Sequence, residues 1–263
     1  MEVGMYHLVT KEEYGDLAKF LYGSPELNVN FTSLLITHGF LNQSITTWVR
    51  SAGGRLTGAC SIYEGVAYVF EREGMDHDPL LSLLIGRKLR AITGPCHLIT
   101  GLAEKMEHQR VWITHLMRLD HLNELGAVDS CPIQPLQLED IAGKILVQND
   151  AFELKIDPED EKQRMLFDLK LLKGYVAKMD GKVVAAGEWT SSHPIYGTLV
   201  GIATLPEYRR NHCAQAISVQ LCKDIISAGK TPVLRYDNPA AGRLYEKIGF
   251  VFVADYAVMF FDE

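Results

Sequence analysis

The sequence lacks the features that would place this chain in a membrane or on nucleic acid. No apolar run approaches the roughly 18–20 residues that a membrane-spanning helix needs. Basic residues are not in excess: 26 lysines and arginines stand against 33 acidic residues, which leaves a formal net charge of −7. No overall positive field therefore attracts nucleic acid or an anionic membrane. The stretch MEVGMYHLVTKEE becomes polar too early for a secretory signal, so we expect a cytoplasmic protein.

Cysteine is also scarce, and its pattern argues against two kinds of scaffold. The chain has five cysteines, an odd number, with no CxxC pair among them. Histidines with zinc-ligand spacing are absent too, so we expect neither a disulfide scaffold nor a metal site. We expect buried small apolar side chains, with a reactive thiol as the alternative, at Cys60, Cys96, Cys131, Cys213 and Cys222.

What is present is the composition of a folded globular protein. Of the 263 residues, 47% are hydrophobic and 22% are charged, which excludes a disordered or fibrous chain. Two prolines in SCPIQP, residues 130–135, interrupt regular structure near the middle of the chain. We expect one domain over residues 1–130 and another over residues 131–263.

Local signals predict the order of elements in the second half. Asp157-Pro158 followed by acidic residues is typical of a helix start, and Asp180-Gly181 predicts a hairpin between two strands. A third strand over 196–204 follows, and then a helix over 212–228. A strand at TPVLRYD leads to a helix that opens at Asp237-Asn238-Pro239 and closes at Gly249, before the last strands, FVFVADYAVMFF.

The first half repeats this order more faintly, which indicates a diverged tandem repeat. We expect helices at 12–22, 30–40, 79–91 and 102–109, and strands at 45–50, 56–62, 66–70, 96–99 and 111–119.

The segment IATLPEYRRNHCAQAISVQL, residues 202–221, carries the strongest chemical signal. A strand stops at Pro206, Arg209 and Arg210 follow, and a helix begins with no acidic residue in between. This arrangement points unpaired backbone N–H groups and the positive end of a helix dipole at one place, which is a way to bind phosphate. An ordinary helix start with two solvated arginines is the alternative.

Together with DNPAAGRLYEKIGF, this segment resembles the GNAT superfamily of acyl-CoA-dependent acyltransferases. The family's phosphate loop runs Arg/Gln-x-x-Gly-x-Gly/Ala. Here Arg209 and Ala214 match its first and last positions, whereas His212 stands at the central glycine. The later signature Asn-x-x-Ala-x-x-x-Tyr, followed by Gly-Phe, is matched by Asn238, Ala241, Tyr245, Gly249 and Phe250.

The resemblance implies an α/β (α+β) fold of tandem GNAT-like domains, the first of them degenerate. Each would be a mixed, mostly antiparallel sheet flanked by helices. It implies an N-acetyltransferase that uses acetyl-CoA as co-substrate and needs no metal. The implied acetyl-CoA contacts are Ile202, Ala203, Thr204, Arg209, Arg210, Asn211, His212, Cys213, Ala214, Asn238 and Ala241.

The resemblance also indicates residues for proton transfer. In the family, the tyrosine that matches Tyr245 commonly protonates the departing CoA thiolate; a core tyrosine is the alternative. A base is often supplied by the strand that holds Glu188, because the amine must lose a proton before it attacks. A solvated strand glutamate is the alternative for Glu188. His193 is the next candidate base, with a turn histidine as its alternative.

Two further positions carry expectations. A helix-start residue needs no left-handed backbone, so the histidine at 212 fits if its ring turns away, and contact of its imidazole with a phosphate is the alternative. In the first half, EREGMDHDP stands at the equivalent turn, with four carboxylates against one arginine. We expect those carboxylates to repel a pyrophosphate, so that only the second half binds CoA. The first half would then shape the substrate pocket or the domain interface.

We therefore expect transfer of an acetyl group to a primary amine of a small molecule by direct attack. Use of a larger acyl-CoA by an amino-acid conjugase stays open. A non-catalytic acyl-CoA-binding sensor or interaction protein is the alternative from another class. The expected partner is the small-molecule amine, and a homodimer is left open. The acceptor itself is not identified, since acceptor-binding loops vary independently of the fold.

Overall fold

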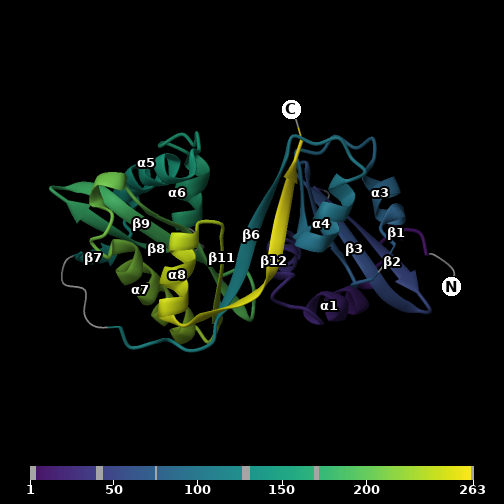
Figure 1. Cartoon of the computed structure of the whole chain (residues 1–263). Coiled ribbons are helices and arrows are strands. Elements are labelled where there is room, and N and C mark those ends of the chain that lie inside the picture. The colour runs from purple at the N-terminus through teal and green to yellow at the C-terminus, as the bar shows by residue number, and fades with distance from the viewer. Residues whose placement is uncertain (1–3, 40–43, 75, 126–130, 169–171, 262–263) are drawn as a thin grey trace. The chain divides into compact units, whose positions relative to one another are not determined.

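A computed structural model of the chain describes residues 4–39, 44–74, 76–125, 131–168 and 172–261 (Figure 1). The chain packs into two compact units. Residues up to Leu116 form the first together with the residues from Val253 on, and Met117–Phe252 form the second. The predicted boundary between residues 130 and 131 adjoins 126–130, which lie outside the described residues. Packing divides the chain differently from the predicted domains, because the end of the last strand pairs within the first unit.

The first unit is a mixed sheet in the order β1-β2-β3-β4-β5-β12, in which β4 and β5 pair in parallel and the other neighbours pair antiparallel. Successive side chains of its strands point to opposite faces. Ala59 and Phe70 belong to a core cluster with α1 and α2, whereas Cys60 and Val69 belong to one with α3 and α4. The elements are β1 (His7–Leu8), α1 (Tyr14–Tyr22), α2 (Val29–His38), β2 (Ile45–Ala52), β3 (Arg55–Tyr63), β4 (Val66–Glu71), α3 (Asp78–Leu84), β5 (Ala91–Pro95), α4 (Cys96–Ala103) and β6 (Arg110–Leu119), whose last residues belong to the second unit.

The second unit repeats this design with the sheet order β11-β10-β9-β8-β7. Strands β10 and β11 pair in parallel, and the other neighbours pair antiparallel. Val176 and Ala186 pack in a cluster with α5, whereas Ala177 and Ala185 pack in one with α7 and α8. The elements are β7 (Ile133–Pro135), α5 (Ile141–Phe152), α6 (Glu161–Asp168), β8 (Leu172–Met179), β9 (Lys182–Thr190), β10 (Tyr196–Thr204), α7 (Cys213–Ser227), β11 (Thr231–Tyr236), α8 (Pro239–Ile248) and β12 (Phe250–Phe260), which continues into the first unit. Both units are thus mixed, mostly antiparallel sheets flanked by helices, and the predicted fold class is confirmed.

Local chemistry accounts for the elements that the sequence predicts well. Helix α8 begins where the Asn238 side chain accepts a hydrogen bond from the backbone N–H of Ala240, and it ends at Gly249 with a φ of +117°. The β8–β9 hairpin turns at Asp180 and Gly181, whose φ values of +49° and +78° are those that a tight two-residue turn requires.

Four predicted elements were wrong. No helix spans 102–109, where one was expected, because α4 already ends at Ala103. The helix expected to begin at residue 158 begins at Glu161, because Asp157 forms a turn by accepting a hydrogen bond from the Glu159 N–H. Residues 96–99 are helical rather than a strand, since Pro95 initiates α4. The helix expected over 79–91 ends at Leu84, and Ala91 already belongs to β5. Within the described residues, no helix is long and apolar enough to span a membrane, and no group of three or more His, Cys, Asp or Glu residues could hold a metal ion.

Candidate active site

Strand β10 is interrupted by a bulge immediately before the predicted contacts Ile202, Ala203 and Thr204. Its register with β9 shifts between Val200 and Ala203, and Gly201 adopts a φ of +62°. The Gln148 side chain of α5 donates a hydrogen bond to the Gly201 carbonyl oxygen at 3.1 Å. A Cβ on Gly201 would lie 2.0 Å from that amide nitrogen, so only glycine fits both the backbone conformation and the contact. The isolated glycine within a strand pattern is the sequence signal for this bulge, and Gln148 gave no signal of its own.

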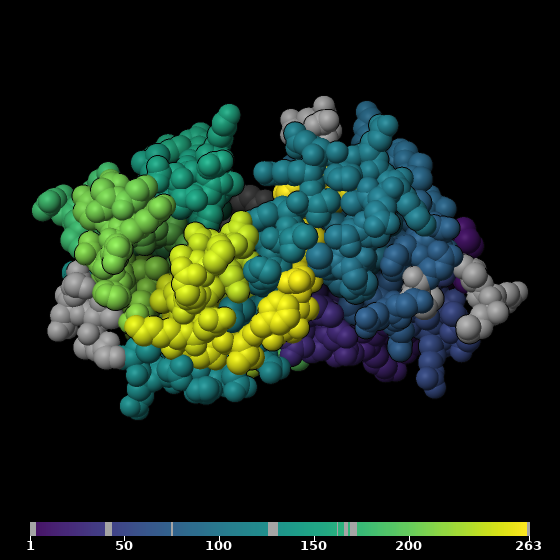
Figure 2. All heavy atoms as spheres, viewed as in Figure 1, coloured from purple at the N-terminus to yellow at the C-terminus, as the bar shows by residue number. Residues whose placement is uncertain are grey.

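The loop from Arg209 to Ala214 has the backbone of an anion-binding turn. Arg210 and His212 have φ values of +69° and +59°, and Asn211 between them has a negative φ. Such alternation of backbone conformations directs successive N–H groups into one concavity. Helix α7 begins at Cys213, which adds the free N–H groups and dipole of a helix start. Figure 2 shows the light-green and yellow segments that include α7 and α8 at the surface of the second unit.

One side chain connects this loop to the end of β10. The exposed Arg209 donates from Nε to the Thr204 carbonyl oxygen at 3.3 Å. The Thr204 hydroxyl oxygen is buried and has no hydrogen-bond partner among the described residues. A buried polar group without a partner is uncommon in a folded protein, and a ligand with polar atoms would satisfy it. The residues at the end of β10 therefore fit a polar ligand such as the pantetheine arm of acetyl-CoA.

The expectation for His212 was wrong in one respect. This residue precedes α7 with a φ of +59° and a ψ of +15°, which is left-handed, whereas we expected no left-handed backbone at the helix start. The family's glycine adopts that conformation without steric cost, and a histidine pays about 1–2 kcal/mol for it. The loop geometry is thus retained although the glycine is missing.

The expectation for two cysteines was also wrong. Cys131 and Cys213 form a disulfide, whose two residues are separated by 82 positions in the sequence. Both are 1% exposed. The bond joins the segment before β7 to the first residue of α7, directly after the loop. Cys60 and Cys222 are free and buried, as expected, and Cys96 is free and partly buried.

Tyr245 lies on α8 in the core cluster that also contains Cys213, with Ile202 and Ala241 packed against its edge. Its side chain is 6% exposed, and its ring packs at 6.0 Å from Tyr236 and at 5.8 Å from Phe250. Burial raises the pKa of Tyr245 above its ordinary value of 10.0, and the neighbouring Cys222 adds to the effect. The phenol therefore stays protonated at neutral pH and can donate a proton. Asn238 is engaged as the cap of α8.

Glu188 lies on β9 on the opposite face of the sheet, the face that α5 covers. It is 8% exposed, and its Oε2 lies 2.6 Å from the Lys144 ammonium. That ammonium also donates to Gln163 of α6 at 2.8 Å. The predicted general base is therefore buried and ion-paired rather than solvated. One signal could have identified Lys144, a lysine within the apolar run Ile141–Phe152, but we assigned no helix to that run.

His193 has a structural contact in the turn between β9 and β10. Its Nδ1 accepts hydrogen bonds from the backbone N–H groups of Ile195 and Tyr196, each at 3.1 Å. Burial and the nearby Lys230 lower the pKa of His193 from 6.5 to about 4. Its contacts support the turn-histidine alternative.

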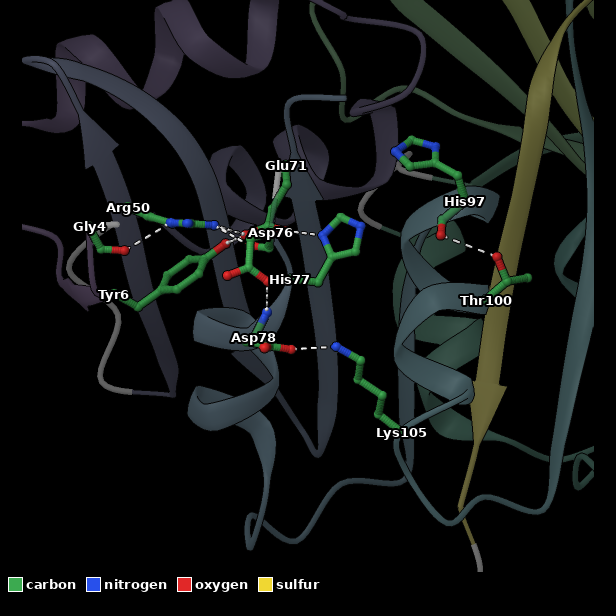
Figure 3. A network of polar contacts seen from close by, with 10 residues as sticks. All are labelled: Gly4, Tyr6, Arg50, Glu71, Asp76, His77, Asp78, His97, Thr100 and Lys105. Atoms are coloured by element: carbon green, nitrogen blue, oxygen red, sulfur yellow. Dashed lines mark hydrogen bonds and ion pairs between the residues drawn. The ribbon is translucent and has the colours of Figure 1, made fainter. Parts of the chain in front are cut away.

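The equivalent turn of the first unit, after β4, is held by its own charges (Figure 3). Glu71 and Arg50, 0% and 2% exposed, approach to 3.2 Å, and Arg50 also donates to the Asp76 carbonyl oxygen at 2.6 Å. The Tyr6 hydroxyl donates to Glu71 at 2.8 Å, and His77 Nδ1 lies 2.6 Å from its other oxygen. Asp78, another of the four carboxylates at this turn, pairs with Lys105. Where the second unit has a loop with left-handed residues and a helix start, this turn of the first unit thus holds a buried carboxylate with its own cation.

Comparison with known proteins agrees with the geometry. The family model for GNAT acetyltransferases matches residues 126–259, about half of the chain, and the chain belongs to this family. It is accordingly an acetyltransferase that depends on acyl-CoA. A search of curated proteins found no match.

Solved structures share the fold over nearly the whole chain. A GCN5-related N-acetyltransferase from Sphaerobacter thermophilus is 12% identical with a TM-score of 0.68, over 98% of this chain and 95% of that one. A GCN5-related N-acetyltransferase-like protein from Streptococcus suis is 16% identical with a TM-score of 0.58, over 93% and 99%. A tandem GNAT protein from the clavulanic acid biosynthesis pathway is 12% identical with a TM-score of 0.57, over 97% of both chains.

Proposed function

We propose that the second unit transfers an acetyl group from acetyl-CoA to a primary amine of a small molecule. The observation that carries this proposal is the loop over 209–213, in which two left-handed residues flank Asn211 and lead into α7. Backbone N–H groups of this loop, with Arg209 and Arg210, bind the pyrophosphate. Ile202, Ala203 and Thr204 bind the pantetheine arm, and Ala241 leaves room for it on α8.

The chemistry assigned to the site is direct transfer. Glu188 accepts a proton from the acceptor's ammonium group, and the free amine attacks the thioester carbonyl carbon. As the carbon–sulfur bond breaks, Tyr245 donates its phenolic proton to the thiolate, and the resulting phenolate is reprotonated by the proton that the attacking nitrogen loses when the amide forms. Burial raises the pKa of Tyr245, which keeps the phenol protonated at neutral pH and also makes it a weaker acid, so the role is supported by the position of Tyr245 in the family motif.

Calorimetry with acetyl-CoA tests the binding loop. Arg209→Glu/Arg210→Glu should weaken binding by about 1–3 kcal/mol, the range of charge-assisted hydrogen bonds. The matched control is Lys11→Glu/Arg55→Glu, which changes two exposed cations of the first unit and alters the net charge equally. If both double variants bind like the parent, the loop does not hold the pyrophosphate.

Thiol release from acetyl-CoA with a panel of primary amines tests the reaction itself. We expect release that depends on the amine, with the acetylated amine detected by mass spectrometry. Absence of amine-dependent release across amino acids, polyamines and amino sugars would contradict transfer to a small-molecule amine.

A further inference from the structure

Helix α5 supports the candidate base through a charged contact that the reaction scheme does not yet use. Lys144 is 1% exposed, and its ammonium lies 2.6 Å from Glu188 Oε2. Burial of a lysine and a glutamate costs free energy that a close pair with further hydrogen bonds offsets. Gln163 of α6 supplies a further hydrogen bond at 2.8 Å. Lysine and glutamate are rarely buried without such a pairing.

Among the described residues opposite or beside Glu188 on β8, β10 and α5, Lys144 is the charged group that contacts its carboxylate. From β8, the residue opposite Glu188 is Gly174, and from β10 it is Val200. A Cβ on Gly174 would lie 3.1 Å from the Glu188 Cβ, so the glycine leaves room beside the carboxylate. One turn before Lys144, Asp140 pairs with Lys178 of β8 at 2.5 Å and is thus neutralised.

The same helix face also holds the bulge of β10. Lys144 and Gln148 are four residues apart and therefore share one side of α5. Lys144 contacts Glu188, and Gln148 donates to the Gly201 carbonyl oxygen, one residue beyond the cross-strand partner of Glu188. One rigid element thus positions both the candidate base and the bulge.

We propose that Lys144 is a positioning residue, which holds Glu188 ionised and oriented for proton transfer from the acceptor amine. The proposal rests on the proposed function, because it gives Glu188 the part of the base. Lys144 acts only through Glu188. A cation this close stabilises the negative charge of a carboxylate, and this is the interaction that the variants below remove.

The test compares pH–rate profiles of the full chain. Lys144→Met removes the charge and keeps an apolar stem, so the acid limb of kcat/KM should move up by about 1–3 pH units. KM for acetyl-CoA should change little, because the loop over 209–214 is untouched. Lys144→Arg retains a cation and should bring the acid limb back toward the parent position.

The matched control is Lys178→Met, which breaks the neighbouring pair of the partly exposed Lys178 with Asp140 and should leave the acid limb in place. If Lys144→Met does not fold, Lys144→Gln replaces it, since a glutamine keeps a hydrogen bond to Glu188 and removes the charge. A second readout does not depend on turnover. The Tm values of the parent and of Glu188→Gln are measured over a range of pH, and the difference between them reports the contribution of the Glu188 carboxylate to stability. The pH at which this difference vanishes should rise when Lys144 is replaced.

The outcomes separate the two proposals. Suppose that the parent releases thiol in an amine-dependent way, but that the acid limb of kcat/KM lies at the same pH in Lys144→Met as in Lys178→Met. This result would overturn the role of Lys144 and leave the proposed function standing. No release by the parent with any amine would overturn the proposed function, and the part of Lys144 in it. Movement of both the acid limb and the Tm difference in Lys144→Met alone supports the proposal.

Discussion

At the residue scale, single atoms fix the backbone around the site. Gly201 combines a φ of +62° with a contact that leaves no space for a side chain, whereas Gly181 has a φ of +78° and open space around it. The two glycines therefore separate the cost of a left-handed backbone from the cost of crowding.

Gly201→Ala should lower the free energy of unfolding by more than Gly181→Ala does. The backbone cost is about 1–2 kcal/mol at either position, and only at Gly201 must the Gln148 amide also move. Thermal and denaturant unfolding of both variants would measure the difference. Adding Gln148→Ala to Gly201→Ala should recover part of the lost free energy of unfolding. If Gly201→Ala and Gly181→Ala lose the same free energy of unfolding, the crowding argument is contradicted.

His193 predicts a dependence of stability on pH. Its pKa is lowered to about 4 by burial first and by Lys230 second, from an ordinary value of 6.5. Between pH 6.5 and pH 4 the unfolded chain binds a proton that the folded chain refuses, so stability should fall as the pH is lowered through this window. His193→Asn retains an acceptor for the turn without titrating. Its unfolding free energy, measured from pH 7 to pH 4, should fall by about 1–3 kcal/mol less than that of the parent. Parallel curves would rule out this assignment.

At the element scale, α7 is tied to a distant segment at its first residue. The Cys131–Cys213 disulfide closes a separation of 82 residues, which restricts the unfolded chain. The bond therefore stabilises the element that begins the proposed phosphate loop.

Reduction of this disulfide should lower the free energy of unfolding by about 2–4 kcal/mol. Tm would be measured with and without a thiol reductant. Cys131→Ser/Cys213→Ser should lose its response to the reductant, and Cys96→Ser, at a free cysteine, should keep it. A parent whose Tm ignores complete reduction would contradict the prediction.

Elements defined by neighbouring residues were predictable from the sequence, and those defined by distant partners were not. Helix α8 shows its cap, proline and closing glycine within a dozen residues, and the order of strands in the second unit follows from turn signals. Helix α5 was missed because Lys144 and Gln148 interrupt its apolar face. These two side chains are buried because they contact Glu188 and Gly201, which are distant in the sequence. The disulfide was missed for the same cause, since nothing near Cys213 identifies Cys131 as its partner.

At the scale of the whole molecule, two similar folds carry unequal turns. The turn after β10 offers backbone N–H groups and two exposed arginines, whereas the turn after β4 holds the buried Glu71–Arg50 pair. We therefore expect an anion to bind at the turn after β10 and not at the turn after β4.

Acetyl-CoA should therefore bind at one site per chain. Calorimetry measures the stoichiometry, and hydrogen exchange locates the protection, which we expect over 209–216 and not over 71–78. Ligand at 100 times its Kd should stabilise the folded protein by about 2.7 kcal/mol. Two sites, or protection of the turn after β4, would contradict this prediction.

The path of β12 sets the order in which the protein can be completed during synthesis. Tyr256–Phe260 pair antiparallel with Ala91–Pro95, so the sheet of the first unit is completed by residues that the ribosome adds after the second unit, Met117–Phe252. Until then the edge of β5 that β12 will occupy lacks this partner, and an unpaired edge is a template for pairing with other chains. The first unit is thus completed only after the second unit has been synthesised. A ribosome that stalls shortly before residue 256 would release a protein with its proposed catalytic loop fully synthesised and an aggregation-prone edge in its other half.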